Sequence, residues 1–277
     1  FLVRSWVSIE KDPQCRRVTR SIVPTSALRD DLTDVTTVGN KLDGVPFDLM
    51  IDTSPCQPWS RLRDDPKGFD EPGAKPFIAA NALYKRVRNT NPHIQYIVEN
   101  VEPKSSLLYQ KDRMEAMWGS KFTTINAKDW GSPSSRPRNY CTNICTVQDI
   151  PGTNTPDPNL FISDDHYCEG PHMPCIVASE YTRNVPVVKS RTTHKPRRLT
   201  VAEAEALQMW PPHITDGFQT PLGISQSERH KMVGNAVNGA HLYEILKRFR
   251  YKNTDAPSVN PVILEHADSD KLELFLL

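Results

Sequence analysis

The sequence predicts an α/β fold, with a mostly parallel sheet covered by helices and a small irregular lobe beside it. Short apolar runs alternate with segments of helical periodicity through the first half of the chain, which is the pattern of strands joined by helices. Composition then changes, because residues 146–196 are rich in Pro, Asp, Asn and Thr. We therefore expect an α/β domain formed by residues 1–145 and 197–252, a small lobe at 146–196, and a loosely ordered tail at 253–277.

Composition sets limits on the class of protein. The 277 residues, of which 38% are hydrophobic and 24% charged, suffice for one sizeable core and a smaller lobe. No apolar run approaches the roughly 20 residues of a membrane span, and no signal peptide is visible, so we expect an intracellular protein, nuclear if its source is eukaryotic. Six cysteines are too sparse for a disulfide framework, and their spacing matches no compact zinc pattern, so no metal site is predicted.

Four predicted strand ends in the first half carry a side chain suited to chemistry. They are Glu10 after a strand at 6–9, Asp31 in an aspartate-rich turn, Cys56 after the apolar run 45–51, and Glu99 after a strand at 93–98. In a parallel sheet such ends share one edge, so we expect the four side chains to converge on one crevice. Glu10 suits the two hydroxyls of a ribose and Asp31 an exocyclic amine, although each alone is also consistent with an ordinary surface acid.

The connections between these strands show helical spacing. Pro76 opens a helix that runs to Asn91, and a second helix is expected at about 106–118 with Gly119 as its C-cap. A further strand is expected at 122–125.

Regular structure is expected to be sparse in the lobe and to return after it. Brief strands are expected at 175–177 and 185–188. Thr200 and Glu203 form a predicted capping box that opens a helix, and a last helix is expected to carry an apolar face over 236–249.

The loop around Cys56 is the most informative stretch of the chain. Its sequence, Pro55-Cys56-Gln57-Pro58, holds two prolines that can join neither a helix nor a strand ladder, so it predicts a stiff loop that presents one thiol at the end of a strand. A buried structural cysteine is the alternative interpretation.

A basic segment offers a surface for a polyanion. Because the net charge is only +1, such a partner must be met by a local patch. The candidate residues are Lys189, Arg191, Lys195, Arg197 and Arg198. A solvated loop is the alternative interpretation of the same residues.

The order of four motifs resembles that of the DNA (cytosine-5)-methyltransferases. They are Pro55-Cys56-Gln57, Glu99-Asn100-Val101, Arg136-Pro137-Arg138 and Gly234-Asn235-Ala236-Val237. The resemblance covers about residues 6–250 and is greatest to the de novo branch of eukaryotic enzymes and to some phage relatives. It implies a Rossmann-like methyltransferase sheet, with residues 146–196 as the target-recognition lobe.

The resemblance also implies an activity and a set of site residues. The expected reaction is methyl transfer from S-adenosylmethionine to C5 of a cytosine flipped out of double-stranded DNA. Cys56 would add to C6, Glu99 would hydrogen-bond to N3, and the arginines would stabilise charge on the ring. The expected catalytic residues are Cys56, Glu99, Arg136 and Arg138, the cofactor-binding residues are Glu10, Asp31, Pro55, Asn235 and Val237, and the basic segment would hold phosphates.

The chain departs from the family pattern in one respect, and three alternatives stay open. The Phe-x-Gly-x-Gly turn of the family's first motif is absent, so we expect that turn and its strand upstream of Phe1, and a truncated chain that binds the cofactor poorly. The alternatives are a non-catalytic DNA-binding relative, a tRNA methyltransferase, whose Cys-Phe-Thr signature is not seen, and a cysteine-dependent hydrolase with His93 as its base.

Overall fold

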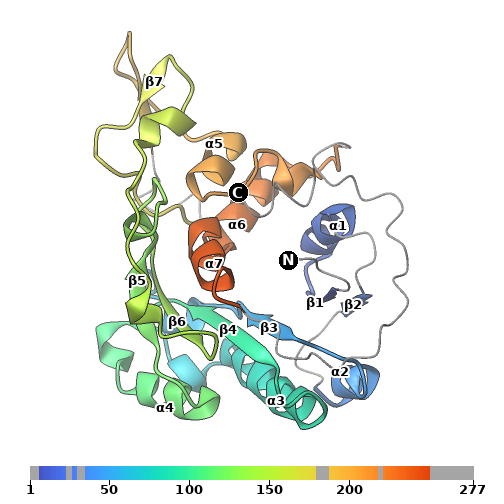
Figure 1. Cartoon of the computed structure of the whole chain (residues 1–277). Coiled ribbons are helices and arrows are strands. Elements are labelled where there is room, and N and C mark those ends of the chain that lie inside the picture. The colour runs from blue at the N-terminus through green and yellow to red at the C-terminus, as the bar shows by residue number, and fades with distance from the viewer. Residues whose placement is uncertain (1–5, 23–26, 30–34, 179–186, 218–220, 250–277) are drawn as a thin grey trace.

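The structure, a computed structural model, describes residues 6–22, 27–29, 35–178, 187–217 and 221–249. Its described strands form three sheets (Figure 1). The main sheet has the order β3 (Leu49–Asp52), β4 (Gln95–Asn100), β6 (Pro137–Thr142), β5 (Thr123–Asn126). A two-stranded sheet pairs β1 (Val7–Ile9) with β2 (Ala27–Arg29). The third sheet consists of β7 (His166–Tyr167), β8 (Val187–Ser190) and β9 (Pro196–Arg198).

The helices lie between and around these sheets. They are α1 (Pro13–Ile22), α2 (Val35–Leu42), α3 (Lys75–Thr90), α4 (Gln110–Trp118), α5 (Val201–Leu207), α6 (Gln226–Asn235) and α7 (Gly239–Leu246). The predicted α/β class is therefore confirmed. None of the helices in the described part of the chain is long and apolar enough to cross a membrane.

Several local predictions are confirmed by backbone geometry. Gly119 ends α4 in the left-handed region at a φ of 71°, where a residue without a Cβ carries no steric penalty. Thr200 and Glu203 form the predicted capping box at the start of α5. A second capping box, between Ser225 and Glu228, opens the unpredicted α6. The predicted helix over 236–249 is shorter, because the chain leaves helical geometry between α6 and α7.

The main sheet is less parallel than expected. Strands β3 and β4 are parallel, but β6 runs antiparallel to both β4 and β5. The sequence prediction missed β6 because its first residues, Pro137 and Arg138, are poor strand formers. The segment from 127 to 136 joins β5 to β6 without an α-helix, and so short a connection favours an antiparallel pair over a parallel crossover.

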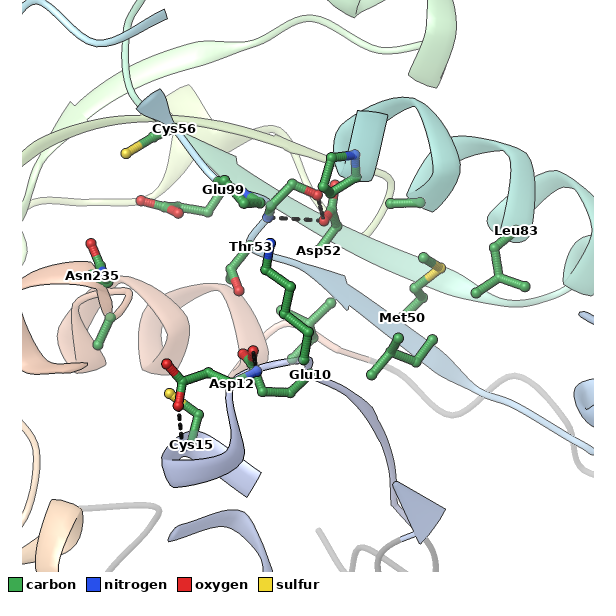
Figure 2. A pocket seen from close by; sticks show the side chains of 18 of the residues that line it. Glu10, Asp12, Cys15, Met50, Asp52, Thr53, Cys56, Leu83, Glu99 and Asn235 are labelled. Atoms are coloured by element: carbon green, nitrogen blue, oxygen red, sulfur yellow. Dashed lines mark hydrogen bonds between the residues drawn. The ribbon is translucent and has the colours of Figure 1, made fainter. Parts of the chain in front are cut away.

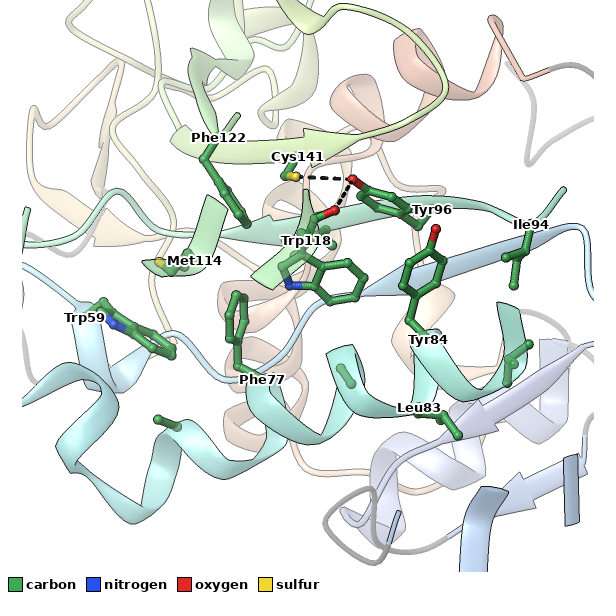
Figure 3. Packing of buried hydrophobic residues seen from close by; sticks show 14 of the residues in the cluster. Trp59, Phe77, Leu83, Tyr84, Ile94, Tyr96, Met114, Trp118, Phe122 and Cys141 are labelled. Carbon is green, nitrogen blue, oxygen red and sulfur yellow. Dashed lines mark hydrogen bonds between the residues drawn. The ribbon is translucent and has the colours of Figure 1, made fainter. Parts of the chain in front are cut away.

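An aromatic cluster fills the space between the main sheet and helices α3 and α4 (Figure 3). Phe77 of α3 packs edge-on against Trp59 and Trp118, with ring centroids 5.3 and 6.3 Å apart. Tyr96 of β4 donates its hydroxyl to the carbonyl of Trp118 at 2.9 Å, which satisfies a polar group that would otherwise be costly to bury. Trp59 is completely buried and follows Cys56 by three residues, so the core anchors the Cys56 loop.

Two further cores complete the molecule. On the other face of the main sheet, Ile97 of β4 and Tyr140 of β6 pack with Ile245 of α7. The small lobe has its own cluster, in which Met173 and Val188 pack with residues of α5 and α6. The lobe is therefore packed against α5 and α6, whereas α7 is the helix that packs on this face of the main sheet. The expected tail at 253–277 lies outside the described residues.

Candidate active site

A cleft of about 1480 Å³ lies along β1 and β3 and reaches α6 (Figure 2). Its size exceeds the roughly 300–1,000 Å³ of a pocket for one drug-sized ligand, so it has room for two ligand groups side by side. Most of the residues singled out in the sequence line it: Glu10, Pro55, Cys56, Glu99, Arg136, Arg138 and Asn235. Residues from five separate stretches of the sequence thus meet in one site.

Cys56 stands at the start of a short 3-10 helix directly after β3. Side chains of β4 and α4 help to hold its loop. The side chain of Asn100 donates to the carbonyl of Ser54 at 3.4 Å, and Nε1 of Trp59 donates to Oε1 of Gln110 at 3.1 Å. Burial raises the pKa of the Cys56 thiol, while the positive charge of Arg138 opposes this shift. The thiol therefore sits in a stiff loop beside a guanidinium that stabilises its ionised form.

Glu99 and Arg138 form a buried ion pair on adjacent antiparallel strands. Glu99 Oε1 lies 3.1 Å from Arg138 Nε, and their side chains are only 9% and 12% exposed. Burial raises the pKa of Glu99 even though Arg138 and Arg136 oppose the shift. Burial thus favours the protonated form of Glu99, which can donate a hydrogen bond, and the two arginines favour its carboxylate.

Arg136 lies in the wall of the cleft but is turned toward the protein. Its guanidinium donates to the carbonyls of Ile176 at 2.7 Å, Ala236 at 2.6 Å and Gly234 at 3.1 Å. Its Nε has no partner among the described residues. Arg136 therefore ties β6 to the lobe and to the end of α6, and Arg138 is the arginine that pairs with Glu99 in the cleft.

The opposite end of the cleft suits a nucleoside. Figure 2 shows Glu10, at the end of β1, across the cleft from Cys56 and Glu99. One oxygen of Glu10 accepts the backbone N–H of Asp12 at 2.7 Å. A carboxylate at that strand end matches the ribose-binding position of doubly wound sheets, so these residues fit a nucleoside-containing cofactor.

Two of the expected cofactor-binding residues, Asp31 and Val237, have no observed place in the cleft. Asp31 lies outside the described residues. Val237 is 8% exposed, packs with Ile97 and Tyr140 in the core and does not line the cleft. The side chain of Val237 therefore does not face the cleft, and the expectation that this residue binds the cofactor remains a prediction. The side chain faces the core because α6 ends at Asn235, after which the chain turns Val237 inward.

Asp52 is a cleft residue that the sequence prediction missed. It ends β3, is 5% exposed, and accepts the backbone N–H of Ser54 at 3.0 Å through Oδ1. Its Oδ2 has no partner among the described residues. Burial raises its pKa to about 7. A polar residue closing an otherwise apolar run was the available signal, since a buried strand has no structural need for an acid.

The basic residues of the lobe lie on β8, β9 and the turn between them, outside the cleft. Lys189 is paired with Glu169 at 2.6 Å, and Arg197 is paired with Glu203 at 2.8 Å. Lys195 and Arg191 are exposed in the turn. Arg198, also exposed, ends β9. Part of the predicted basic patch is therefore neutralised by neighbouring acids.

Comparison with known proteins gives one family and a consistent fold. The family model described as C-5 cytosine-specific DNA methylase matches residues 3–166, more than half of the chain. The type II methyltransferase M.HgiCII of Herpetosiphon aurantiacus is 28% identical over 158 residues, which are 54% of this chain and 34% of that protein. The chain thus spans about a third of the length of this curated relative.

Two solved structures resemble the whole fold. The methyltransferase EhMeth of Entamoeba histolytica superposes with a TM-score of 0.61 at 13% identity, over 88% of each chain. The Dnmt2 methyltransferase of S. pombe gives a TM-score of 0.59 at 14% identity, over 89% of this chain and 90% of that one. At such low identity these likenesses establish the fold.

Proposed function

Because the chain belongs to the C-5 cytosine-specific DNA methylase family, we propose that it methylates C5 of cytosine in DNA through a covalent Cys56 adduct. The observation that carries the proposal is the meeting of Cys56, Glu99 and Arg138 in one cleft. The match to a DNA methylase favours DNA over tRNA as the substrate. The retained thiol, acid and arginine favour an enzyme over a non-catalytic relative.

The chemistry explains why these three side chains are needed together. C5 of cytosine is a poor nucleophile, and addition of a thiolate to C6 turns the ring into an enamine that reacts at C5. The positive charge of Arg138 favours the thiolate of Cys56. Protonated Glu99 donates to N3 of the ring, where electron density increases during addition. The base reaches these groups only when it leaves the stacked duplex.

The same cleft offers contacts for the cofactor that this family uses. S-adenosylmethionine, when bound, supplies an electrophilic methyl group on its sulfonium. Glu10 would hold its ribose, and Pro55 and Asn235 would border it, since all three line the cleft. After transfer, a base takes the C5 proton and Cys56 leaves as a thiolate, which restores the aromatic ring.

Trapping on fluorinated DNA tests the proposal. Duplex DNA that contains 5-fluorocytosine, mixed with the full chain at saturating S-adenosylmethionine, is expected to give a covalent protein–DNA complex that survives denaturing electrophoresis. The reason is that fluorine at C5 cannot leave as a proton does. Cys56→Ser is expected to abolish the complex, and Cys145→Ser, outside the cleft, to retain it. Absence of the complex with the unmodified chain would favour a non-catalytic relative.

A further inference from the structure

The loop that follows Cys56 is fastened at both ends by one buried side chain, that of Gln110 at the start of α4. The side-chain oxygen of Gln110 accepts the indole N–H of Trp59 at 3.1 Å and the backbone N–H of Phe69 at 2.9 Å. Gln110 is only 5% exposed, so these hydrogen bonds lie away from water. One carbonyl group therefore holds the start and the end of the loop together.

The glycine that precedes Phe69 permits this contact. Gly68 has a φ of 60°, in the left-handed region that glycine adopts without a steric penalty. A Cβ at this position would overlap the carboxamide of Gln110. The loop therefore supplies both the hydrogen-bond donors and the space that the Gln110 side chain needs.

The fastened start of the loop is connected directly to the thiol residue. The backbone N–H of Trp59 donates to the carbonyl of Cys56 at 3.0 Å, across the short 3-10 helix Gln57–Trp59. The indole ring of Trp59 is completely buried beside Phe77, with ring centroids 5.3 Å apart (Figure 3). A displacement of Trp59 is therefore transmitted to Cys56 through a single tight turn.

Lys104 adds contacts between this loop and the segment that follows β4. Its backbone N–H donates to the carbonyl of Trp59 at 3.0 Å, and its ammonium donates to the carbonyls of Arg63 and Asp64 at 3.1 and 2.6 Å. The bonds of the ammonium lie at the surface, where water competes for the same groups, whereas those of Gln110 are buried and therefore stronger. Gln110 is thus the main fixing point of the loop.

We propose that Gln110 is a positioning residue for methyl transfer, because it fixes the thiol of Cys56 relative to Glu99. Cys56 follows β3 and Glu99 lies in β4, and the contacts of Gln110 and Lys104 join the segments that follow these two strands. This role rests on the proposed function, since a fixed thiol matters when the thiol adds to a base. Gln110 does not line the cleft, yet a misplacement of about 1 Å caused by a distant residue can lower a rate about 100-fold.

Single-turnover trapping on DNA that contains 5-fluorocytosine measures this role, at temperatures where every variant is folded. Gln110→Met keeps a similar shape but removes the acceptor, and is expected to slow formation of the covalent complex by about 10–100-fold. The Kd for DNA is expected to change by less than about 2-fold, because the ground-state contacts remain. Gln110→Glu retains an acceptor oxygen and is expected to recover most of the rate.

The matched control for trapping is Gln148→Met, which removes an exposed glutamine bonded to Thr123 and is expected to keep the rate of the unmodified chain. A rate in Gln110→Met equal to that of the unmodified chain overturns the proposal. A loss of DNA affinity as large as the loss of rate also overturns it, because a positioning residue acts after the DNA is bound.

Alkylation of Cys56 separates the role of Gln110 from the proposed function, because it needs neither DNA nor cofactor. Iodoacetamide modification, mapped by mass spectrometry, is expected to be several-fold faster at Cys56 in Gln110→Met, since a loosened loop exposes the thiol. Cys145, outside the cleft, is the internal reference. An unmodified chain that forms no covalent complex with DNA overturns the proposed function, whereas equal alkylation of Cys56 in Gln110→Met and the unmodified chain overturns the role of Gln110.

Discussion

The cleft and the small lobe use their charged residues in opposite ways. In the cleft, burial dominates: it raises the pKa of Glu99, and it raises that of Asp52 to about 7. Where the lobe meets α5, Arg197 of β9 and two backbone N–H groups bind Glu203, and the pKa of that acid falls to about 2 although burial alone would raise it. Glu203 is therefore an anion that secures β9 to α5. In the cleft, by contrast, the pKa values of Glu99 and Asp52 are raised, which favours their protonated forms.

Arg136, directly before β6, and Arg138, within β6, repeat the contrast over three residues. They are two residues apart on the sequence motif, yet Arg136 is 2% exposed and bound to backbone carbonyls, whereas Arg138 pairs with Glu99. One arginine of the motif, Arg136, therefore holds backbone segments together, and the other, Arg138, lines the cleft beside Glu99. Arg136 precedes the first residue of β6 and is therefore not bound by the alternation of the strand, whereas Arg138 lies within it.

The largest expected effect is on the cleft's central acid. Glu99→Gln removes the proton that Glu99 donates to the base while it keeps the shape of the side chain. We expect methyl transfer in single-turnover assays to fall by about 10²–10⁴-fold, the usual contribution of a general acid. Glu102→Gln, which changes a nearby acid paired with Arg61, is the matched control and is expected to retain activity. Equal losses in the two variants would contradict the role given to Glu99.

A smaller effect is expected from the pH dependence of stability. The pKa of Asp52 is raised in the folded chain to about 7, so the folded state holds a proton that the unfolded chain releases near pH 4. Its stabilising contribution is present below pH 4 and is lost as pH rises toward 7, with an upper limit of about 4 kcal/mol. Asp52→Asn is expected to flatten the unfolding free energy over this window in chemical denaturation. Asp64→Asn, on an exposed loop, is expected to leave the slope unchanged.

The smallest effect is expected on the surface of the lobe. Lys195→Ala removes an exposed cation from the β8–β9 turn and is expected to weaken DNA binding by a few-fold. The slope of log K against the logarithm of salt concentration is expected to become smaller by about one, which corresponds to the loss of one phosphate contact. Lys189→Ala removes a cation already paired with Glu169 and is expected to have less effect. Fluorescence anisotropy at several salt concentrations measures both. The opposite ranking would show that the ion pair opens when DNA binds.

Local signals in the sequence predicted much of the fold. Helix α3, the C-cap at Gly119 and the capping box at Thr200 follow from short-range rules, and the structure confirms them. The same rules could have found α6 through Ser225 and Glu228. They could not find β6, because its residues become a strand only when β4 and β5 offer edges on both sides.

For the site, the order of the motifs predicted Cys56, Glu99 and Arg138 from the sequence alone, and the structure places these three residues in one cleft. Only the tertiary structure shows that Arg136 binds backbone carbonyls whereas Arg138 faces the cleft. It also shows that the side chain of Val237 is buried in the core and that Asp52 lines the cleft. Those outcomes depend on which long-range partners a side chain meets. Burial and charge are properties of the assembled surroundings, so no local pattern in the chain encodes them.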